Sequence, residues 1–383
     1  MRNPVATARK TVLWHEVVSA WLLCRLLQPL CRRPFLPRAM HMLPTYRCNA
    51  RCIMCGIWEE AHAADRELTL ADFERLLRDR LFSRMEFVGI SGGEPFLRND
   101  LPALVRVLRK CCPRLKRVSL TTNGILSDRI GEALPVIAAD CRESGVLLDV
   151  SVSLHGLGDR LTHIYGVEDA FARIVRTVEE LKRRRAGGEL TFSFNGVLLR
   201  DNLDHAPDLA RWAGAQGIPI SFVVGEQRAR FRNETRANVY LDEADRPRLL
   251  AFLSTLDQGL SPRYLSPLRY RELIRLLEGR GDRTLPCYYA LGGLVLGHDG
   301  QLYYCSHSRS IGNGLARPAH ELYYDAANLA YRRSELLGAE CRRCPPYTLT
   351  RWEIEANAWG VARALLTERW RRRRQPCREE CSR

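Results

Sequence analysis

Six short apolar runs with the composition of β-strands alternate with stretches of helical pattern along the chain. The runs cover residues 40–45, 85–90, 117–120, 146–154, 190–199 and 218–224. Strands that alternate with helices favour a parallel sheet, because parallel strands need a crossover between them. Six βα units approach a barrel but fall short of the eight units of a complete one. The sequence therefore predicts an α/β fold built on a partial (βα)6 barrel.

The helical stretches between these runs carry start and stop signals. We expect a helix to begin at Thr69, whose hydroxyl can cap the first turn together with Asp72. A long helix is expected over residues 170–184, and Gly187-Gly188 gives its stop signal. Shorter helices are expected over residues 101–108 and 203–215.

The pattern changes after about residue 230. Two helical stretches, residues 243–256 and 266–277, lead to a segment rich in Gly and Cys that begins at Cys287. We therefore predict five regions along the chain. They are an N-terminal amphipathic helical segment (1–39), the partial barrel (40–230), a helical connector (231–284), a small cysteine-rich auxiliary-cluster domain (285–350), and a C-terminal helix with a basic tail (351–383).

Three cysteines follow the first apolar run in the pattern Cys48-x3-Cys52-x2-Cys55. Three soft thiolates on one loop can bind three irons of a cubane and leave the fourth iron open. The spacing resembles the signature of the radical S-adenosylmethionine (SAM) superfamily, and the resemblance covers about residues 40–224. It implies a [4Fe–4S] cluster whose open iron chelates SAM and passes an electron to its sulfonium. A zinc site, with His62 as a further ligand, and three unrelated core cysteines are the alternatives.

Further residues that match the family follow later strands, where parallel folds place their chemistry. Gly92-Gly93-Glu94-Pro95 is similar to the GGEP motif, in which glycines permit close backbone approach and the carboxylate accepts hydrogen bonds from the SAM ammonium group. Ser153 is similar to the serine that contacts the carboxylate or ribose of SAM. His155 stands where many relatives carry Asp, and a satisfied polar residue is the simpler interpretation of it.

The resemblance also implies cofactor contacts from Asn123 and Asn195, although Asn is common in turns for its backbone tolerance alone. Met54 and Trp58 flank the triplet, where they would pack near the adenine or shield the cluster. Glu226, Gln227 and Arg228 follow the sixth run and are expected to face the cavity, or to form an ordinary exposed loop.

A second set of four cysteines lies in the last part of the sequence: Cys287, Cys305, Cys341 and Cys344. Four thiolates complete a closed cubane, and the spacing resembles the twitch domain, a short form of the SPASM domain of many radical enzymes. Asp299-Gly300 predicts a β-hairpin turn that carries Cys305 towards the others. Zinc on the same four thiolates is the alternative. The remaining cysteines are assigned to packing or to the basic tail.

The net charge of +15 arises largely from arginine runs of the kind found on solvated helix faces. We therefore do not expect nucleic acid as a partner, and no motif supports it. The apolar stretch 12–30 is interrupted by charged residues, so it predicts no transmembrane span, while peripheral membrane contact stays open. Without a clean secretory signal, a cytoplasmic location is expected, where thiols stay reduced.

The resemblance implies an oxidoreductase or maturase that converts SAM to a 5′-deoxyadenosyl radical, which abstracts hydrogen from a C–H bond. The family suggests a peptide or small molecule as substrate, in peptide maturation or in sugar or aminocyclitol oxidation or epimerisation. A flavodoxin or ferredoxin would supply the electron. The alternatives are an iron–sulfur or zinc scaffold protein and a radical enzyme that modifies RNA.

Overall fold

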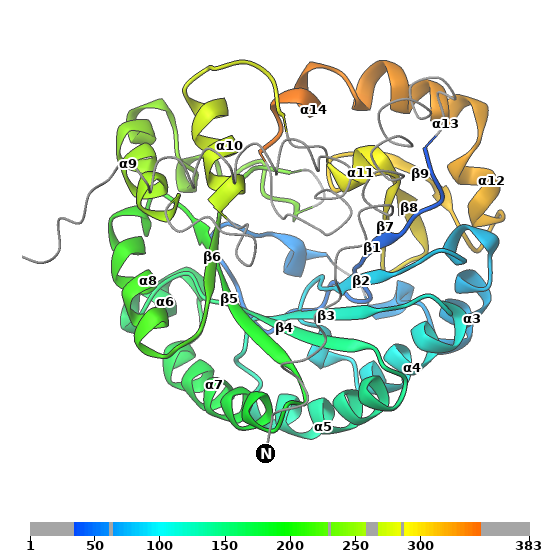
Figure 1. The fold of residues 1–383 in the computed structure, drawn as a ribbon, viewed down its shortest axis with the longest axis horizontal. Coiled ribbons are helices and arrows are strands. Elements are labelled where there is room, and N and C mark those ends of the chain that lie inside the picture. The colour runs from blue at the N-terminus through cyan, green and yellow to red at the C-terminus, as the bar shows by residue number, and fades with distance from the viewer. Residues whose placement is uncertain (1–33, 61–63, 229–230, 258–266, 285–286, 346–383) are drawn as a thin grey trace, which may run out of the picture. The chain divides into compact units, whose positions relative to one another are not determined.

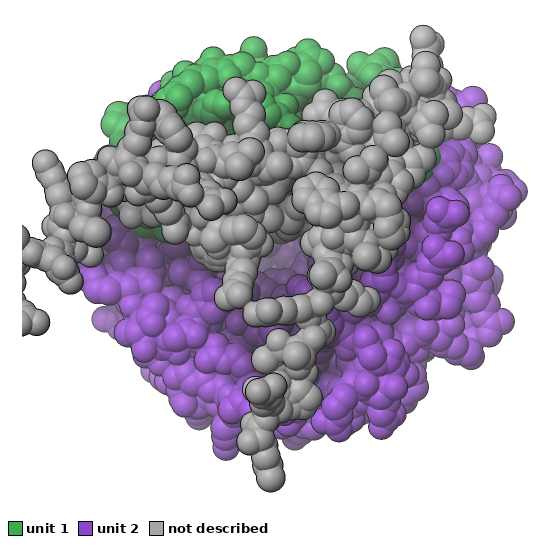
Figure 2. Space-filling view, viewed as in Figure 1, with its two compact units in different colours: residues 1–35, 246–291, 333–383 green, residues 36–245, 292–332 purple. Residues whose placement is uncertain are grey.

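The computed structural model describes residues 34–60, 64–228, 231–257, 267–284 and 287–345. Contacts within the chain divide it into two compact units, which Figure 2 colours separately. The barrel unit comprises Leu36–Asp245 and Gly292–Arg332. The second unit takes its described residues from Met1–Phe35, Arg246–Leu291 and Arg333–Arg383. All strands of the described residues belong to the barrel unit.

The described strands of the barrel unit form one sheet in the order β6-β5-β4-β3-β2-β1-β7-β8-β9 (Figure 1). Strands β1 to β7 are parallel where they pair, and β8 and β9 are antiparallel. No pairing joins the edge strands β6 and β9 within the described residues, so the barrel stays open. The bounds are β1 (Ala39–Met42), β2 (Phe87–Ile90), β3 (Arg117–Thr122), β4 (Leu147–Ser153), β5 (Thr191–Leu198), β6 (Ile220–Val224), β7 (Gly293–Leu296), β8 (Gln301–Tyr303) and β9 (Ser310–Asn313).

The predicted α/β class and partial barrel are confirmed, and each of the six predicted runs overlaps one of the strands β1 to β6. The sheet continues beyond β6 through β7, β8 and β9, which lie at residues 293–313. The predicted hairpin turn at Asp299-Gly300 is also confirmed, since Val295 pairs with Tyr303 and Leu296 with Leu302.

Helices follow the strands and lie along the outer side of the barrel unit in Figure 1. Within α4, Leu101, Leu104, Val105 and Leu108 are buried, and this spacing forms the apolar stripe of a helix packed on a sheet. The bounds are α3 (Leu70–Leu77), α4 (Leu101–Cys111), α5 (Ser127–Glu143), α6 (Gly158–Tyr165), α7 (Ala170–Ala186), α8 (Ala206–Ala215), α12 (Ala319–Tyr323) and α13 (Ala326–Tyr331).

The predicted start of α3 is confirmed in detail. Thr69 accepts a hydrogen bond from the Asp72 backbone N–H, and the Asp72 carboxylate accepts one from the Thr69 backbone N–H, which completes a capping box. The helix α5 was not expected from the sequence pattern. It carries Pro135 in its interior, which removes one backbone hydrogen bond of the helix.

The second unit is helical in its described residues, with α9 (Arg246–Leu256), α10 (Pro267–Leu277), α11 (Tyr288–Leu291) and α14 (Ala339–Arg343). Helices α9 and α10 fall within the two predicted helical stretches. The predicted N-terminal helical segment, up to residue 33, and the predicted C-terminal helix and tail lie outside the described residues. No helix of the described residues has both the length and the apolar character that a membrane span requires.

Short helical turns complete the described structure. They are η3 (Ile57–Glu59), η4 (Ala64–Arg66), η5 (Arg80–Phe82), η6 (Pro95–Leu97), η7 (Leu203–His205), η9 (Ala237–Val239), η10 (Glu243–Asp245) and the π-helical η11 (Arg332–Leu336). The carboxyl ends of three neighbouring strands align closely. Met42, the last residue of β1, pairs with Ile90 of β2 and with Leu296 of β7. The loops that follow β1, β2 and β7 therefore start side by side at one edge of the sheet.

Candidate active site

The three cysteines of the triplet lie on one loop, residues 43–56, which leaves the carboxyl end of β1 and which we call the cysteine loop. Cys48, Cys52 and Cys55 are half-buried free thiols. Burial raises the pKa of Cys48 to about 11 and that of Cys52 well above its ordinary value, and the neighbouring thiols strengthen both shifts. Thiols that influence one another in this way lie close together. Metal coordination deprotonates a thiol outright, so these cysteines would bind iron as thiolates despite their raised pKa values.

The donor set of the triplet fits an iron–sulfur cubane. In the described part of the chain, no three His, Cys, Asp or Glu side chains are gathered tightly enough to hold one metal ion. A cubane places each thiolate on a different iron, so its ligands stand further apart than those of a single ion. The Asn123 side-chain N–H also points at Cys48 Sγ, at 3.9 Å, as a hydrogen-bond donor to a thiolate would.

The conformation of the cysteine loop is fixed by hydrogen bonds to its own carbonyl groups. The Cys55 N–H donates to the Cys52 carbonyl at 3.1 Å, and Trp58 Nε1 donates to the Cys55 carbonyl at 2.8 Å. Arg51 Nη1 donates to the Cys48 carbonyl at 2.8 Å, and its guanidinium lies over the Trp58 ring. Trp58 thus stabilises the backbone conformation of the loop through its indole N–H.

Gly92 and Gly93, which follow β2, lie in close contact with the backbone of the cysteine loop. A Cβ on Gly92 would lie 2.3 Å from the Thr45 carbonyl oxygen, and one on Gly93 would lie 2.0 Å from that of Arg47. The Gly93 N–H donates to the Thr45 carbonyl at 2.8 Å. Only glycine fits these two positions. The atoms that exclude a side chain there belong to the backbone of the cysteine loop.

Glu94 joins the loop after β2 to the turn after β3. Its side chain is fully buried, and its Oε1 accepts hydrogen bonds from Thr122 Oγ1 at 2.9 Å and the Phe96 N–H at 3.1 Å. Its Oε2 accepts from the Asn123 N–H at 2.7 Å. Burial raises the pKa of Glu94 to about 7, against the effect of these three donors. Asn123 in turn donates to Asn49 Oδ1 of the cysteine loop at 2.8 Å.

Ser153 and Asn195 are direct neighbours in the sheet, because they are paired residues of β4 and β5. The structure therefore brings together two polar residues that the sequence separates. The Ser153 carbonyl accepts a hydrogen bond from the Tyr165 hydroxyl at 2.8 Å, and Tyr165 lies on α6, whose end also binds the cysteine loop through the Arg51 N–H. Tyr165 thus contacts both the end of β4 and the cysteine loop.

His155 is a satisfied polar residue. It is buried, its Nδ1 accepts the Val197 N–H at 3.1 Å, and its ring meets the Tyr165 ring edge-on. Burial lowers the pKa of His155 to about 3, so the ring is neutral at ordinary pH. The side chain holds β4 against β5.

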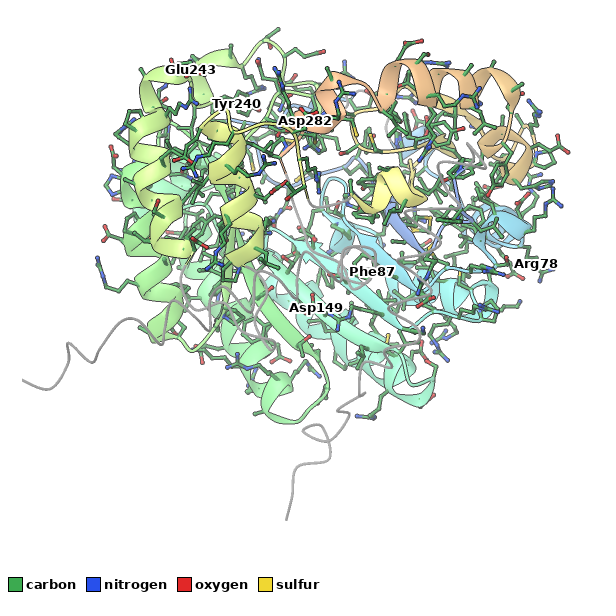
Figure 3. The ribbon with its side chains drawn as sticks, turned by 45° about the horizontal axis from the view of Figure 1, so that its top comes forward. Arg78, Phe87, Asp149, Tyr240, Glu243 and Asp282 are labelled. Carbon is green, nitrogen blue, oxygen red and sulfur yellow. The ribbon has the colours of Figure 1, made fainter. Side chains whose placement is uncertain are left out.

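The carbonyl group of Met54 binds two residues that the sequence pattern did not single out. It accepts hydrogen bonds from Tyr240 Oη at 2.6 Å and from Asn233 Nδ2 at 3.0 Å (Tyr240 is labelled in Figure 3). Both donors lie after β6, and no motif marks either of them in the sequence.

Asp149 of β4, also labelled in Figure 3, links three strands of the sheet. Its carboxylate accepts hydrogen bonds from Ser119 of β3 and Thr191 of β5.

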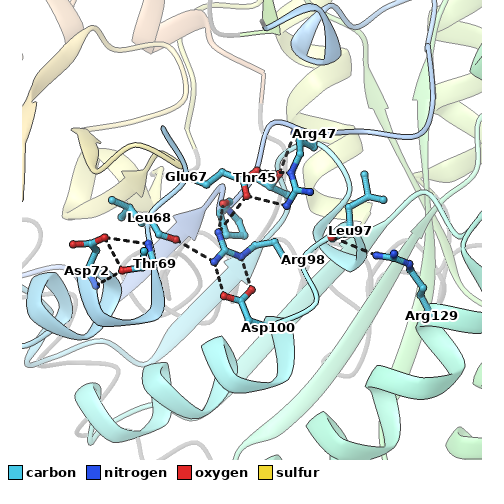
Figure 4. Close-up of polar contacts among 11 residues, drawn as sticks. Thr45, Arg47, Glu67, Leu68, Thr69, Asp72, Leu97, Arg98, Asp100 and Arg129 are labelled. Carbon is cyan, nitrogen blue, oxygen red and sulfur yellow. Dashed lines mark hydrogen bonds and ion pairs between the residues drawn. The ribbon is translucent and has the colours of Figure 1, made fainter. Parts of the chain in front are cut away.

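Arg98 is a third residue that sequence reasoning missed. Its buried guanidinium donates to the Pro44 carbonyl at 3.0 Å, to the Leu68 carbonyl at 3.1 Å and to both carboxylate oxygens of Asp100 (Figure 4). Glu67, 3.6 Å from Arg98, also binds Arg47 of the cysteine loop. Arg98 thereby ties the start of the cysteine loop to the segments before α3 and α4.

Arg228 and Glu226, which follow β6, form an ion pair with each other at 2.9 Å. Arg228 Nη1 contacts Ser306 Oγ at 3.0 Å, and Glu226 lies 3.4 Å from His307 Nε2. Cys305 stands directly before this pair, and its Sγ accepts the His307 N–H at 3.3 Å. The loop after β6, expected either to face the cavity or to be exposed, is thus partly buried at Glu226 and Arg228 and exposed at Gln227, and it is linked to the segment after β8.

The other members of the second cysteine set, Cys287, Cys341 and Cys344, belong to the second unit. Cys341 lies on α14 and Cys344 ends it, and the Cys344 carbonyl accepts a hydrogen bond from Arg283 at 3.4 Å. Of the cysteines assigned to packing, Cys112 and Cys141 are buried and Cys111 is partly so. Cys24, Cys31, Cys377 and Cys381 lie outside the described residues.

Comparison with known proteins relates the barrel unit to one protein family. Residues 42–213 match the model of the Radical SAM superfamily. A GTP 3′,8-cyclase of Rhizobium meliloti is 29% identical over 238 residues, which are 60% of this chain and 63% of that protein. A GTP 3′,8-cyclase of Listeria monocytogenes is 30% identical over 190 residues, or 47% and 51% of the two chains. The chain thus spans between half and two thirds of the length of these curated relatives.

Solved structures share the fold. SuiB of Streptococcus suis bound to S-adenosylmethionine aligns with a TM-score of 0.57 at 16% identity, over 80% of this chain and 70% of that one. Native anSMEcpe with bound AdoMet and a peptide aligns with the same TM-score at 16% identity, over 87% and 99% of the two chains. At these identities the likeness concerns the fold alone.

Proposed function

We propose that this chain, which is an enzyme of the radical SAM type with its radical SAM domain in residues 42–213, holds a [4Fe–4S] cluster on Cys48, Cys52 and Cys55 and cleaves SAM reductively. The observation that carries the proposal is the convergence of these three thiols on one loop at the carboxyl end of β1. When bound, the cluster supplies the electron that splits SAM into methionine and a 5′-deoxyadenosyl radical.

The residues around the cysteine loop have distinct parts in this proposal. Ser153 and Asn195 offer adjacent polar side chains for the carboxylate or ribose of SAM. Asn123 stabilises a thiolate at Cys48 through its side-chain N–H. Glu94 has all three of its hydrogen bonds to protein donors in this structure, so binding of the SAM ammonium group by Glu94 would add to those bonds or replace one. The radical would then abstract hydrogen from a substrate C–H bond in a site shielded from water.

The test is formation of 5′-deoxyadenosine by purified, anaerobically reconstituted protein with SAM and dithionite. We expect the wild type to form it and Cys52→Ala to form none. The matched control is Cys141→Ala, which removes a buried thiol of α5 far along the chain from the cysteine loop. A wild type that forms no 5′-deoxyadenosine, and that Cys52→Ala matches, would refute the proposal.

For the substrate we propose a peptide, in a maturation reaction, or a sugar or aminocyclitol that is oxidised or epimerised. The fold supports the peptide, because SuiB bound to its precursor peptide SuiA and anSMEcpe with a bound peptide share it. Mixing the reconstituted enzyme with deuterated candidate substrates tests this step. Deuterium in 5′-deoxyadenosine identifies the substrate, and its absence with a given compound excludes that compound.

GTP is a second candidate substrate, because the curated relatives at 29–30% identity are named GTP 3′,8-cyclase. The same assay discriminates between the two. GTP labelled at C3′ should pass deuterium to 5′-deoxyadenosine if the chain acts on GTP as those relatives' name implies. Unlabelled product with GTP, together with label from a peptide, would favour the peptide.

We further propose that Cys287, Cys305, Cys341 and Cys344 hold an auxiliary cluster, and that a flavodoxin or ferredoxin supplies the electron. The cysteine spacing supports the auxiliary cluster, since four thiolates complete a closed cubane. A closed cluster would accept an electron from a substrate radical or relay one inward.

A further inference from the structure

The segment 231–240, which we call the strap, follows β6 and is bound to the cysteine loop at several places. The Gly56 N–H donates to the Phe231 carbonyl at 2.8 Å, and Arg236 Nη1 donates to the Ile53 carbonyl at 3.2 Å. A Cβ on Gly56 would lie 2.3 Å from the Arg232 carbonyl oxygen, so the two backbones are in direct contact. The strap therefore lies against the half of the loop that carries Cys52 and Cys55.

The central contact of the strap is with one peptide group. The Met54 carbonyl accepts hydrogen bonds from Tyr240 Oη at 2.6 Å and Asn233 Nδ2 at 3.0 Å. The N–H of the same planar peptide group belongs to Cys55 and donates to the Cys52 carbonyl at 3.1 Å. Both ends of the peptide group between Met54 and Cys55 are thus held, one end by the strap and the other by Cys52.

Both donors on the strap are buried and fully engaged. Asn233 is 1% exposed and Tyr240 is 7% exposed. Asn233 Oδ1 accepts the Arg228 N–H at 2.7 Å, which fixes the orientation of the amide, and Nδ2 also contacts the Glu226 carbonyl and Tyr240 Oη. Hydrogen bonds that are buried in this way are electrostatically stronger than those in water, and breaking one costs more free energy.

The strap also brings a positive charge to the cysteine loop. The Arg236 guanidinium binds the carbonyl of Ile53, which lies between Cys52 and Cys55, at 3.2 Å. The reduction potential of an iron–sulfur cluster depends on charge, hydrogen bonds and solvent exposure around its thiolates.

We propose that Tyr240 and Asn233 are positioning residues that hold the Met54–Cys55 peptide group, and thereby set the reduction potential and the retention of the cluster on Cys48, Cys52 and Cys55. The inference rests on the proposed function, since it presupposes that cluster. It assigns the role at residue 54 to the backbone carbonyl, because that is the atom to which both donors bind.

Tyr240→Phe tests the proposal, because it removes one hydroxyl and keeps the ring. The control is Tyr323→Phe, which removes the hydroxyl of another buried tyrosine, on α12, that donates to the Gly293 carbonyl. We measure the midpoint potential and the electron paramagnetic resonance spectrum of the reduced cluster, with and without SAM, and the rate of iron loss to a chelator. One lost hydrogen bond of typical net strength predicts about three- to tenfold faster iron loss for Tyr240→Phe. Its potential and spectrum should shift, and those of Tyr323→Phe should not.

Asn233→Asp is the second variant, because it keeps the acceptor for the Arg228 N–H and removes the donor to Met54. We expect the same direction of change as in Tyr240→Phe. Wild-type potential, spectrum and iron loss in both variants would overturn the inference while leaving the proposed function intact. A wild type without any reducible cluster would instead refute the proposed function. Circular dichroism of both variants checks that they fold.

Discussion

The two cysteine sets of this chain differ in how their members are distributed over the sequence and the two units. Cys48, Cys52 and Cys55 share one loop of the barrel unit, and hydrogen bonds within eight residues already fix part of its shape. The second set divides between the two units, with Cys305 in one and Cys287, Cys341 and Cys344 in the other. A short-range set depends on one loop, whereas a long-range set depends on the whole tertiary structure. The first should therefore survive changes that abolish the second.

The largest expected effect separates the two sets by their iron content. Cys344→Ala should lose about half of the iron of a chain with two cubanes, and should still cleave SAM. Cys52→Ala should lose cleavage altogether and keep the iron of the second set. Iron and sulfide analysis beside the 5′-deoxyadenosine assay measures both. Equal iron content in Cys344→Ala and the wild type would show that the second set holds no cluster.

The next effect concerns the support of the cysteine loop. Arg98→Met should destabilise the protein by about 2–4 kcal/mol, because it removes a buried guanidinium that pairs with the partly exposed Asp100 and leaves two backbone carbonyls without its hydrogen bonds. Arg129→Met is the control, since Arg129 is exposed and donates to the Leu97 carbonyl (Figure 4) and to Asn99 Oδ1. Denaturant unfolding of the metal-free protein gives both values. Equal losses in the two variants would show that Arg98 has no special part in holding the loop.

The smallest effect depends on pH and concerns His155, which lies in the barrel away from either cysteine set in the sequence. Its pKa of about 3 in the folded chain lies below the ordinary value near 6.5, so between these pH values the unfolded chain binds the proton and the folded chain does not. The free energy of unfolding should therefore fall as pH falls below 6.5, by about 1.4 kcal/mol per pH unit.

His155→Asn keeps an acceptor for the Val197 N–H and removes this titration. The variant should lose less stability than the wild type between pH 6.5 and pH 5, measured by denaturant unfolding. His205→Asn, at an exposed position, is the control. Parallel pH profiles for the wild type and His155→Asn would contradict the assignment of a buried neutral ring.

Local signals in the sequence were sufficient for much of the architecture. Alternating apolar runs predicted the order of β1 to β6, Thr69 and Asp72 predicted the start of α3, and Asp299-Gly300 predicted the hairpin of β7 and β8. Each of these depends on residues a few positions apart, whose preferences act before the chain is folded. The helix α5 was missed because Pro135 breaks the pattern of an uninterrupted helix.

The sequence by itself determined that three thiolates would share one loop after the first strand, because the three cysteines lie within eight residues that follow it. Only the tertiary structure decided what surrounds that loop. Gly92 and Gly93 meet the loop's own backbone, Glu94 binds the turn after β3, and Tyr240 holds the Met54 carbonyl from nearly two hundred residues away. No local preference encodes such pairs, since they form only when the sheet brings distant strand ends to one edge.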